Sequence, residues 1–289
     1  MRVTILGASG FVGSAVRRNA PPGTQLTLVT RTPIPTQAHE IWRNAALDDH
    51  EALAAAMRDT DVVFHCVSYV GTDHDQCRLV NEVGTRNITQ AVQKSGAAAL
   101  IYVSTAGVYG RGPLRGAGEG AALAPLSIAS ASRLFAEQEI TAVSGIVLRP
   151  HLLYGVGDRW VVPLLCAAAN SEDTRLRMSE ALTSVLSVDE LAQQLWAIAT
   201  QKRIQLSRVY NADHGVPQSM REIADMCAEV LSAHEHPFRS RGVTLTEHQV
   251  AMLTEDNWFS SSLPRGLNYP PTRSFALTKD MVRWYSECV

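Results

Sequence analysis

Three glycines near the start of the chain could bind a phosphate group. They are spaced three residues apart in GASGFVG, directly after an apolar run and before an amphipathic segment. Glycines at these points allow a tight turn, let backbone N–H groups approach a pyrophosphate, and let a helix pack closely on a strand. We therefore expect this turn to hold a dinucleotide through Gly7, Ser9, Gly10, Phe11, Val12 and Gly13.

The tip of the next apolar run should select between two dinucleotides. NAD-binding proteins commonly carry an Asp or Glu there for the ribose hydroxyls, whereas an Arg can pair with a 2′-phosphate. The segment LTLVTRTP places Thr30 and Arg31 at this tip and has no acid. These residues predict NADPH as the cofactor, with NADH as the second choice, unless Arg31 is only a solvated loop charge.

Alternating strand and helix patterns surround these residues. Between the expected strands, which are short and rich in β-branched residues, lie amphipathic segments with helical periodicity. This alternation predicts a Rossmann-type, doubly wound α/β fold with a parallel sheet covered by helices on both faces. The expected strands are 3–6, 25–30, 61–67, 100–104 and 145–148, and the expected helices are 11–19, 49–58, 75–94 and 128–143.

The second half of the chain is less regular. Helical patterns occupy 188–200, 219–232, 247–254 and 279–286, whereas 110–120 (GRGPLRGAGEG) is predicted to be a flexible loop. We expect a cofactor-binding core over 1–165, to which 184–212 returns. Residues 166–183 and 213–289 are expected to form a smaller, C-terminal substrate-binding lobe.

The composition excludes several classes of protein. The chain has 289 residues, 46% of them hydrophobic, with a formal net charge of −2 and no basic cluster, so no nucleic-acid partner is expected. No apolar run is long enough to span a membrane, which predicts a cytoplasmic protein. The five cysteines are odd in number and lack CxxC spacing, so neither a disulfide framework nor a metal site is expected. A monomer or a homodimer fits equally well.

Several segments resemble the extended and atypical short-chain dehydrogenase/reductases. DVVFHCVS resembles the strand whose end faces the nicotinamide ribose, and NEVGTRNI resembles an Asn-x-x-Gly-Thr helix signature. IYVSTAGVYG resembles the strand and turn that carry a catalytic Ser or Thr, and LRPHLLYG resembles a segment along the nicotinamide. The resemblance implies cofactor contacts from Cys66, Val67, Ser104, Pro150 and His151, and a catalytic hydroxyl at Thr105 or Ser104.

The helix expected at 128–143 departs from this family's pattern. The family carries Tyr-x-x-x-Lys there, and SRLFAEQEI aligns with it without a gap. The tyrosine position then falls on Ala129 and the lysine position on Arg133. The family's proton donor is therefore absent, and a guanidinium that does not release a proton replaces the lysine.

Three groups could take over from the missing tyrosine when a ketone is reduced. A phenolic hydroxyl of the substrate could hydrogen-bond its own carbonyl, His151 could act as an acid, or Thr105 or Ser104 could donate to the developing oxyanion. Arg133 could still hold the cofactor ribose. Each residue also has a structural interpretation: a packed imidazole for His151, a turn cap for Thr105, and an ion pair with Glu137 for Arg133.

The sequence therefore favours an unusual enzyme. We expect an NADPH-dependent ketoreductase that acts on a hydrophobic carbonyl compound, with a resemblance to the atypical ketoreductases of aromatic polyketide (angucyclinone) antibiotic biosynthesis. A non-catalytic redox sensor that binds NADP, of the NmrA type, is the main alternative. A dehydratase or isomerase that uses the same pocket is the third.

Overall fold

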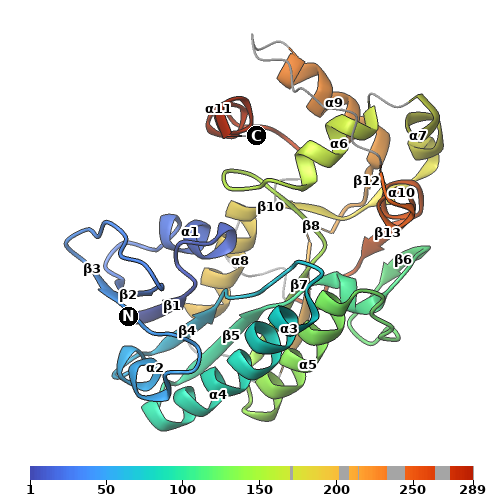
Figure 1. Ribbon diagram of the computed structural model, residues 1–289. Helices are drawn as coiled ribbons and strands as arrows, with labels where there is room; N and C mark the ends of the chain where they lie inside the picture. The colour runs from blue at the N-terminus through green and yellow to red at the C-terminus, as the bar shows by residue number, and fades with distance from the viewer. Residues whose placement is uncertain (170–171, 202–207, 214, 233–244, 264–273, 289) are drawn as a thin grey trace.

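A seven-stranded sheet forms the centre of the molecule (Figure 1). The computed structural model describes residues 1–169, 172–201, 208–213, 215–232, 245–263 and 274–288. The strands follow the order β11-β7-β5-β4-β1-β2-β3, and every neighbouring pair is parallel. This arrangement confirms the predicted Rossmann-type α/β fold.

The strands of this sheet lie close to where the sequence placed them. β3 and β11 lie at the two edges and have no counterpart among the strands expected from the sequence. Edge strands bury fewer apolar side chains, so their sequence signal is weaker. The strands are β1 (Arg2–Leu6), β2 (Gln25–Val29), β3 (Glu40–Arg43), β4 (Val62–His65), β5 (Ala99–Val103), β7 (Ile146–Pro150) and β11 (Val209–Ala212).

Helices cover both faces of the sheet (Figure 1). α1 (Phe11–Arg18) and α8 (Val188–Ala199) pack on one face, where the Trp196 indole donates to the Val16 carbonyl at 2.8 Å. α2 (His50–Ala56), α4 (Gly84–Ser95) and α5 (Ile128–Ala142) lie on the other. Apolar residues therefore fill both sides of the strands, as a doubly wound fold requires.

The single helix expected over 75–94 is divided into three pieces. A short turn, α3 (His74–Gln76), leads into a π-helix, η1 (Cys77–Val83), and then into α4. The wider turns of η1 contain Asn81, which is buried and bonds to the loop after β4. Wide turns of this kind often occur at functional sites.

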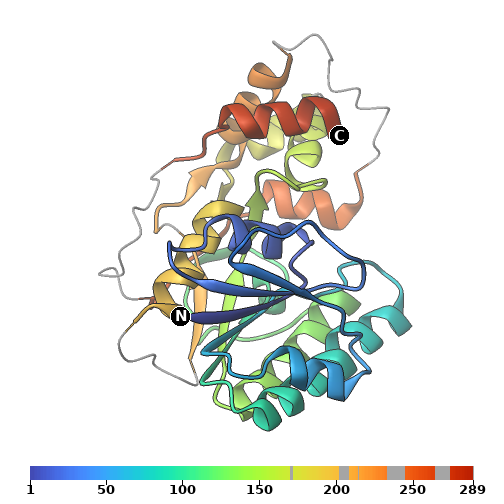
Figure 2. The ribbon, with the colours of Figure 1, turned by 90° about the vertical axis from the view of Figure 1, so that its left-hand side faces the viewer.

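A second group of elements follows the sheet. α6 (Val161–Ala169), α9 (Met220–Ser232) and α11 (Lys279–Cys288) share an apolar core of their own. Around them lie α7 (Glu172–Arg177), α10 (Glu247–Thr254), and the paired strands β8 (Leu152–Tyr154) and β10 (Val185–Ser187). Figure 2 shows α11 crossing in front of these helices at the end of the molecule distant from α2 and α4. The division into a core and a substrate-binding lobe stays a prediction, and 233–244 and 264–273 of the expected lobe lie outside the described residues.

The glycine-rich segment at 110–120 is not wholly a loop, and this part of the prediction is wrong. β6 (Leu114–Ala117) pairs with β13 (Asn257–Phe259) in a four-stranded sheet that also contains β9 (Leu182–Thr183) and β12 (Gln218–Ser219). The ladder partner of β6 is more than 130 residues away in the chain, so the local glycine content could not reveal it.

No helix among the described residues is long and apolar enough to cross a membrane. The cysteines whose side chains are described, Cys66, Cys77, Cys166 and Cys227, are free thiols.

Candidate functional site

The candidate site lies at the carboxyl ends of the parallel strands. β1 pairs with β2 on one side and with β4 on the other, so the chain order of the strands reverses at β1. Ligands of open α/β sheets bind in the crevice at such a switch point. The glycine turn, the loop after β4 and the end of β5 all meet at this edge of the sheet.

The glycine turn after β1 can be formed only by glycine at two of its positions. Gly7 has a φ of +79°, and a Cβ on Gly13 would stand 2.1 Å from the Gly7 carbonyl oxygen. A side chain at Gly13 would therefore push α1 away from β1. A Cβ on Gly10 would stand 3.3 Å from the same oxygen, which is a milder conflict.

The start of α1 offers unpaired backbone donors. Its first internal hydrogen bond runs from the Ser14 N–H to the Gly10 carbonyl at 2.9 Å. The N–H groups of Phe11, Val12 and Gly13 have no partner within the described part of the chain, no side chain caps the helix, and its first turn has no acid. Free N–H groups and the helix dipole favour an anion at this end. These residues thus fit the diphosphate of a dinucleotide.

The loop after β4 lies against the glycine turn. A Cβ on Gly7 would stand 3.0 Å from a methyl group of Val67 and 3.2 Å from the Cys66 carbonyl. Burial raises the pKa of the Cys66 thiol to about 12, so this thiol is neutral at physiological pH and has little nucleophilic character. Cys66 and Val67 can therefore act as walls of the crevice, and their predicted cofactor contacts remain a proposal.

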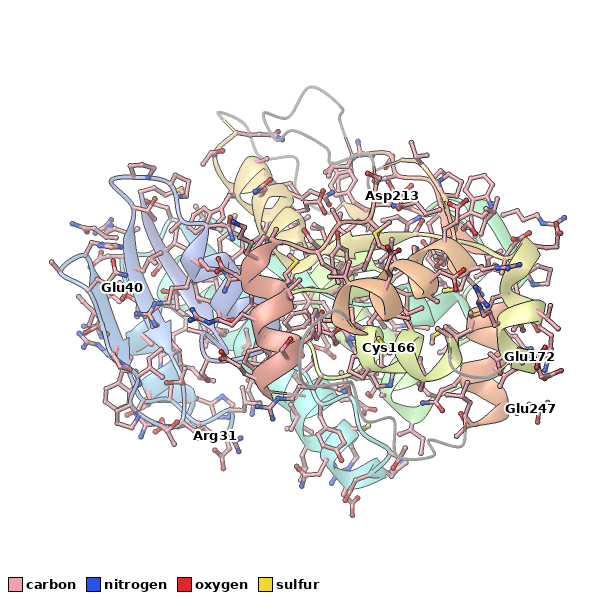
Figure 3. The ribbon with its side chains drawn as sticks, turned by 90° about the horizontal axis from the view of Figure 1, so that it is seen from above. Arg31, Glu40, Cys166, Glu172, Asp213 and Glu247 are labelled. Carbon is pink, nitrogen blue, oxygen red and sulfur yellow. The ribbon has the colours of Figure 1, made fainter. Side chains whose placement is uncertain are left out.

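Two cationic side chains stand at the carboxyl ends of the adjacent strands β2 and β3. Arg31 is exposed and has no carboxylate partner within the described ranges, and Figure 3 shows it at the end of the molecule opposite Glu172 and Glu247. Arg43, at the end of the adjacent β3, is also exposed, and its carbonyl accepts the Thr30 N–H at 3.3 Å. The Thr30 hydroxyl donates to the Thr32 carbonyl at 2.6 Å and accepts from Trp42, so its proton is already committed.

The start of α5 has the architecture of the related helix without its reactive groups. Ser127 caps the helix by accepting the Ser130 N–H at 3.0 Å. Ala129, to which the sequence resemblance assigns the tyrosine position, is half-buried. The Arg133 guanidinium donates to the carbonyls of Val103 and Ser104, the first at 2.8 Å. Arg133 therefore fixes the end of β5, and the alternative interpretation, an ion pair with Glu137, is not what the described residues form.

Glu137 instead belongs to a buried network. It pairs with Arg149 on β7 at 2.5 Å, and each of the two side chains is only 4% exposed. Ser104 donates its hydroxyl proton to Glu137 at 2.5 Å. Since that proton is committed, the Ser104 hydroxyl can accept a hydrogen bond from a ligand but cannot donate one in this conformation.

Thr105 lies just beyond, with a proton that remains available. Its oxygen accepts the Gly107 N–H at 3.0 Å, which is the turn-capping role anticipated from sequence. Its own O–H has no acceptor among the residues described. Ser130 lies nearby, because a Cβ on Gly107 would stand 2.6 Å from its hydroxyl oxygen and 3.3 Å from that of Thr105. Two hydroxyl groups thus flank Gly107 close to Ala129.

His151 is poorly suited to act as a cationic acid. It follows Pro150 at the end of β7, and its ring lies 5.2 Å from that of Phe259. Burial lowers the pKa of His151 to about 4, so the imidazole is neutral at pH 7. Its Nε2 is buried and has no hydrogen-bond partner among the described residues. A neutral ring of this kind can form a hydrogen bond with a ligand but holds no extra proton to transfer.

The hydroxyl of Tyr109, the tyrosine nearest to Ala129 in the sequence, is committed elsewhere. The Tyr109 hydroxyl donates to Asn211 at 2.7 Å and accepts from Arg149 at 2.9 Å. Tyr109 therefore extends the Glu137–Arg149 network toward β11 and is held away from Ala129. The sequence signal for this network is Arg149, a charged residue at the end of the apolar run IVL.

A model of the NAD dependent epimerase/dehydratase family matches residues 3–212 of the chain. This chain belongs to that family. It is accordingly an NAD(P)-dependent oxidoreductase-type enzyme, and the expected extended short-chain dehydrogenase/reductase character is confirmed.

Relatives within the epimerase/dehydratase family act in several ways. The chain is 27% identical over 315 residues to the 2-alkyl-3-oxoalkanoate reductase of Stenotrophomonas maltophilia (strain K279a), covering 99% of this chain and 91% of the relative. It is 29% identical over 131 residues to a Saccharomyces cerevisiae sterol-4-alpha-carboxylate 3-dehydrogenase (decarboxylating), covering 42% and 38% of the two chains.

Solved structures of the family share the fold. UDP-glucuronic acid 4-epimerase from Bacillus cereus in complex with NAD superposes with a TM-score of 0.74 at 17% identity, covering 99% of this chain and 98% of that one. A double mutant of a dTDP-glucose 4,6-dehydratase from Streptomyces venezuelae, with NAD bound, gives a TM-score of 0.76 at 19% identity, covering 100% and 98%.

Proposed function

We propose that this chain is an NADPH-dependent ketoreductase that reduces a hydrophobic, aromatic polyketide-type ketone without the tyrosine that related enzymes carry on α5. One observation carries the proposal: the diphosphate turn is intact, whereas Ala129 and a carbonyl-bound Arg133 occupy the positions of the proton-transfer pair. The parts that hold a hydride donor are kept, and the part that delivers a proton is replaced.

Reduction of a ketone needs a hydride at the carbonyl carbon and a proton at its oxygen. The cofactor, when bound, would supply the hydride, and the N–H groups at the start of α1 would hold its diphosphate. Orientation alone can lower the barrier by several kcal/mol. The chain can therefore retain useful activity after losing a general acid that typically contributes about 10²–10⁴-fold.

Uncommitted donors near Ala129 would stabilise the oxygen as it gains negative charge. The O–H of Thr105 is free because the oxygen only accepts from Gly107. In an aromatic substrate, a hydroxyl beside the carbonyl would hydrogen-bond the same oxygen, and water would deliver the proton afterwards. The space left by the Ala129 methyl group favours a bulky, apolar ketone over the small polar part of a sugar.

The arginines at the carboxyl ends of β2 and β3 support NADPH as the cofactor. Arg31 and Arg43 follow or end adjacent parallel strands, and among the described residues neither pairs with a carboxylate. Charge-assisted hydrogen bonds from guanidinium groups to a phosphate are strong and often bidentate. Arg43 was not anticipated, because β3 was not expected.

The test is a direct one. Purified protein is mixed with NADPH and a panel of ketones, some with a hydroxyl adjacent to the carbonyl and some without, and NADPH absorbance and the alcohol product are measured. We expect NADPH consumption with the hydroxylated aromatic ketones. Tight NADPH binding without turnover of any ketone would instead support the redox-sensor alternative, and a product formed without net NADPH consumption would support dehydration or isomerisation.

The role of His151 can be separated in the same assay. Because its imidazole is neutral at pH 7, we expect His151→Ala to keep kcat within about tenfold of the wild-type value. A loss of about a thousandfold would assign the proton to His151.

A further inference from the structure

Tyr69 carries a phenol that the site described so far does not use, on the loop that borders the glycine turn. It lies in the loop between β4 and α3, two residues after Val67, whose methyl group contacts the glycine turn. The side chain is half-buried, and within the described ranges no residue forms a hydrogen bond with its hydroxyl.

Buried side chains fix the backbone of Tyr69. Its N–H donates to Asn81 Oδ1 at 2.8 Å, and Asn81 Nδ2 donates back to the Tyr69 carbonyl at 2.8 Å. Asn81 is 1% exposed and lies on η1, which packs against α5. The loop therefore has a defined position relative to α5, although no strand or helix contains it.

The same asparagine connects Tyr69 to the position of the missing tyrosine. Asn81 Nδ2 also donates to Ser132 Oγ at 2.9 Å, and Ser132 Oγ donates to the Ala129 carbonyl at 3.0 Å. Three consecutive hydrogen bonds therefore link the Tyr69 carbonyl to the Ala129 carbonyl, through two fully buried side chains. The loop that carries Tyr69 thus runs from the cofactor turn to the start of α5.

The phenol of Tyr69 lies against Gly71, which has no side chain. A Cβ on Gly71 would stand 2.4 Å from the phenolic oxygen and 2.5 Å from the ring carbon that bears it. Any side chain at position 71 would displace the phenol. At position 129, α5 presents only a methyl group, so no phenol from α5 competes for the substrate oxygen.

We propose that Tyr69 supplies, from the loop after β4, the phenolic hydroxyl that α5 lacks, and donates a hydrogen bond to the carbonyl oxygen of the ketone. This inference rests on the proposed ketoreductase function. The O–H bond of the phenol remains intact in this role, which adds a third donor to Thr105 and the substrate hydroxyl. The position that related enzymes fill from a helix is filled here from a loop.

The test compares Tyr69→Phe with wild type on the ketone that the wild type reduces fastest. Phenylalanine keeps the ring over Gly71 and removes only the hydroxyl. Tyr210→Phe is the matched control, because it removes the hydroxyl of a buried tyrosine on β11. We expect Tyr69→Phe to lower kcat by about 10²-fold or more, as loss of an oxyanion donor does, and to leave the NADPH dissociation constant unchanged.

The outcomes separate the two proposals. If the wild type is active and both Tyr69→Phe and Tyr210→Phe keep its kcat and KM, the role of Tyr69 is overturned and the ketoreductase function stands. A wild type that binds NADPH but reduces no ketone overturns the proposed function itself. A kcat loss in Tyr69→Phe with unchanged melting temperature and NADPH affinity supports donation by the phenol.

Discussion

Removing Arg149 should leave the Glu137 carboxylate charged and without its ion-pair partner in the protein interior. In the variant Arg149→Met, the Glu137 carboxylate keeps its Ser104 donor but loses the hydrogen bonds from the guanidinium. In the wild-type protein these bonds are 2.5 to 3.1 Å long. At an effective dielectric constant of about 20, two unit charges about 3 Å apart attract by about 5 kcal/mol. Measured losses for half of a buried ion pair are about 3–5 kcal/mol. We expect the free energy of unfolding to fall by this amount.

The assay is urea unfolding followed by circular dichroism at pH 7.5. With an m value of about 3 kcal/mol per molar urea, a loss of this size moves the midpoint by about 1–1.7 M. The matched control is Glu139→Gln, because Glu139 lies two residues from Glu137 on α5 and pairs with Arg86 at 3.2 Å on the surface. That exposed pair should contribute less than about 1 kcal/mol.

Two further variants separate loss of the ion pair from a general failure of Arg149→Met to fold. Glu137→Gln keeps the shape of the side chain and remains measurable if Arg149→Met does not fold. The double variant Glu137→Leu/Arg149→Met removes both charges, so it should recover most of the stability lost by either single change. The reasoning is refuted if Glu137→Gln or Arg149→Met shifts the midpoint no more than Glu139→Gln does.

Three other predictions concern the cofactor turn, the phosphate contact and acid stability. Gly13→Ala should weaken NADPH binding at least about tenfold in a fluorescence titration, since its Cβ would meet backbone 2.1 Å away, whereas Gly120→Ala, which faces open space, should not. Arg31→Glu should weaken NADPH binding by about 10–100-fold and NADH binding far less, and equal effects on both would remove the phosphate assignment. The unliganded protein should lose stability as pH falls below 6.5, because burial lowers the pKa of His65 to about 3 and that of His151 to about 4. The unfolded chain then binds protons that the folded chain does not, at a cost of about 1.4 kcal/mol per pH unit for each histidine, and chemical unfolding at pH 6.5 and pH 5 measures it. A pH-independent midpoint over that range would contradict the assignment.

Much of the fold could be read from local pattern. The parallel strands of the sheet centre are continuous apolar runs because helices cover both of their faces, and the amphipathic helices between them have the matching period. The boundaries of α5 and α10 agree with the expected ones to within a residue. β3 and β6 were missed, since one lies at a sheet edge and the other pairs with a strand far away in the sequence.

Some features of the candidate site could likewise be read from the sequence, and others depend on the fold. The glycine turn and the absence of tyrosine and lysine on α5 follow from the order of residues, because they depend on residue type at short, fixed spacing. The roles of the polar groups follow from the folded arrangement: Ser104 is committed to Glu137, Thr105 keeps its proton, and Arg133 binds carbonyls. Hydrogen bonds between residues distant in the chain depend on which strands and helices become neighbours, and no local pattern records that. The link from Tyr69 through Asn81 to the start of α5 spans three segments, so it exists only once the chain has folded.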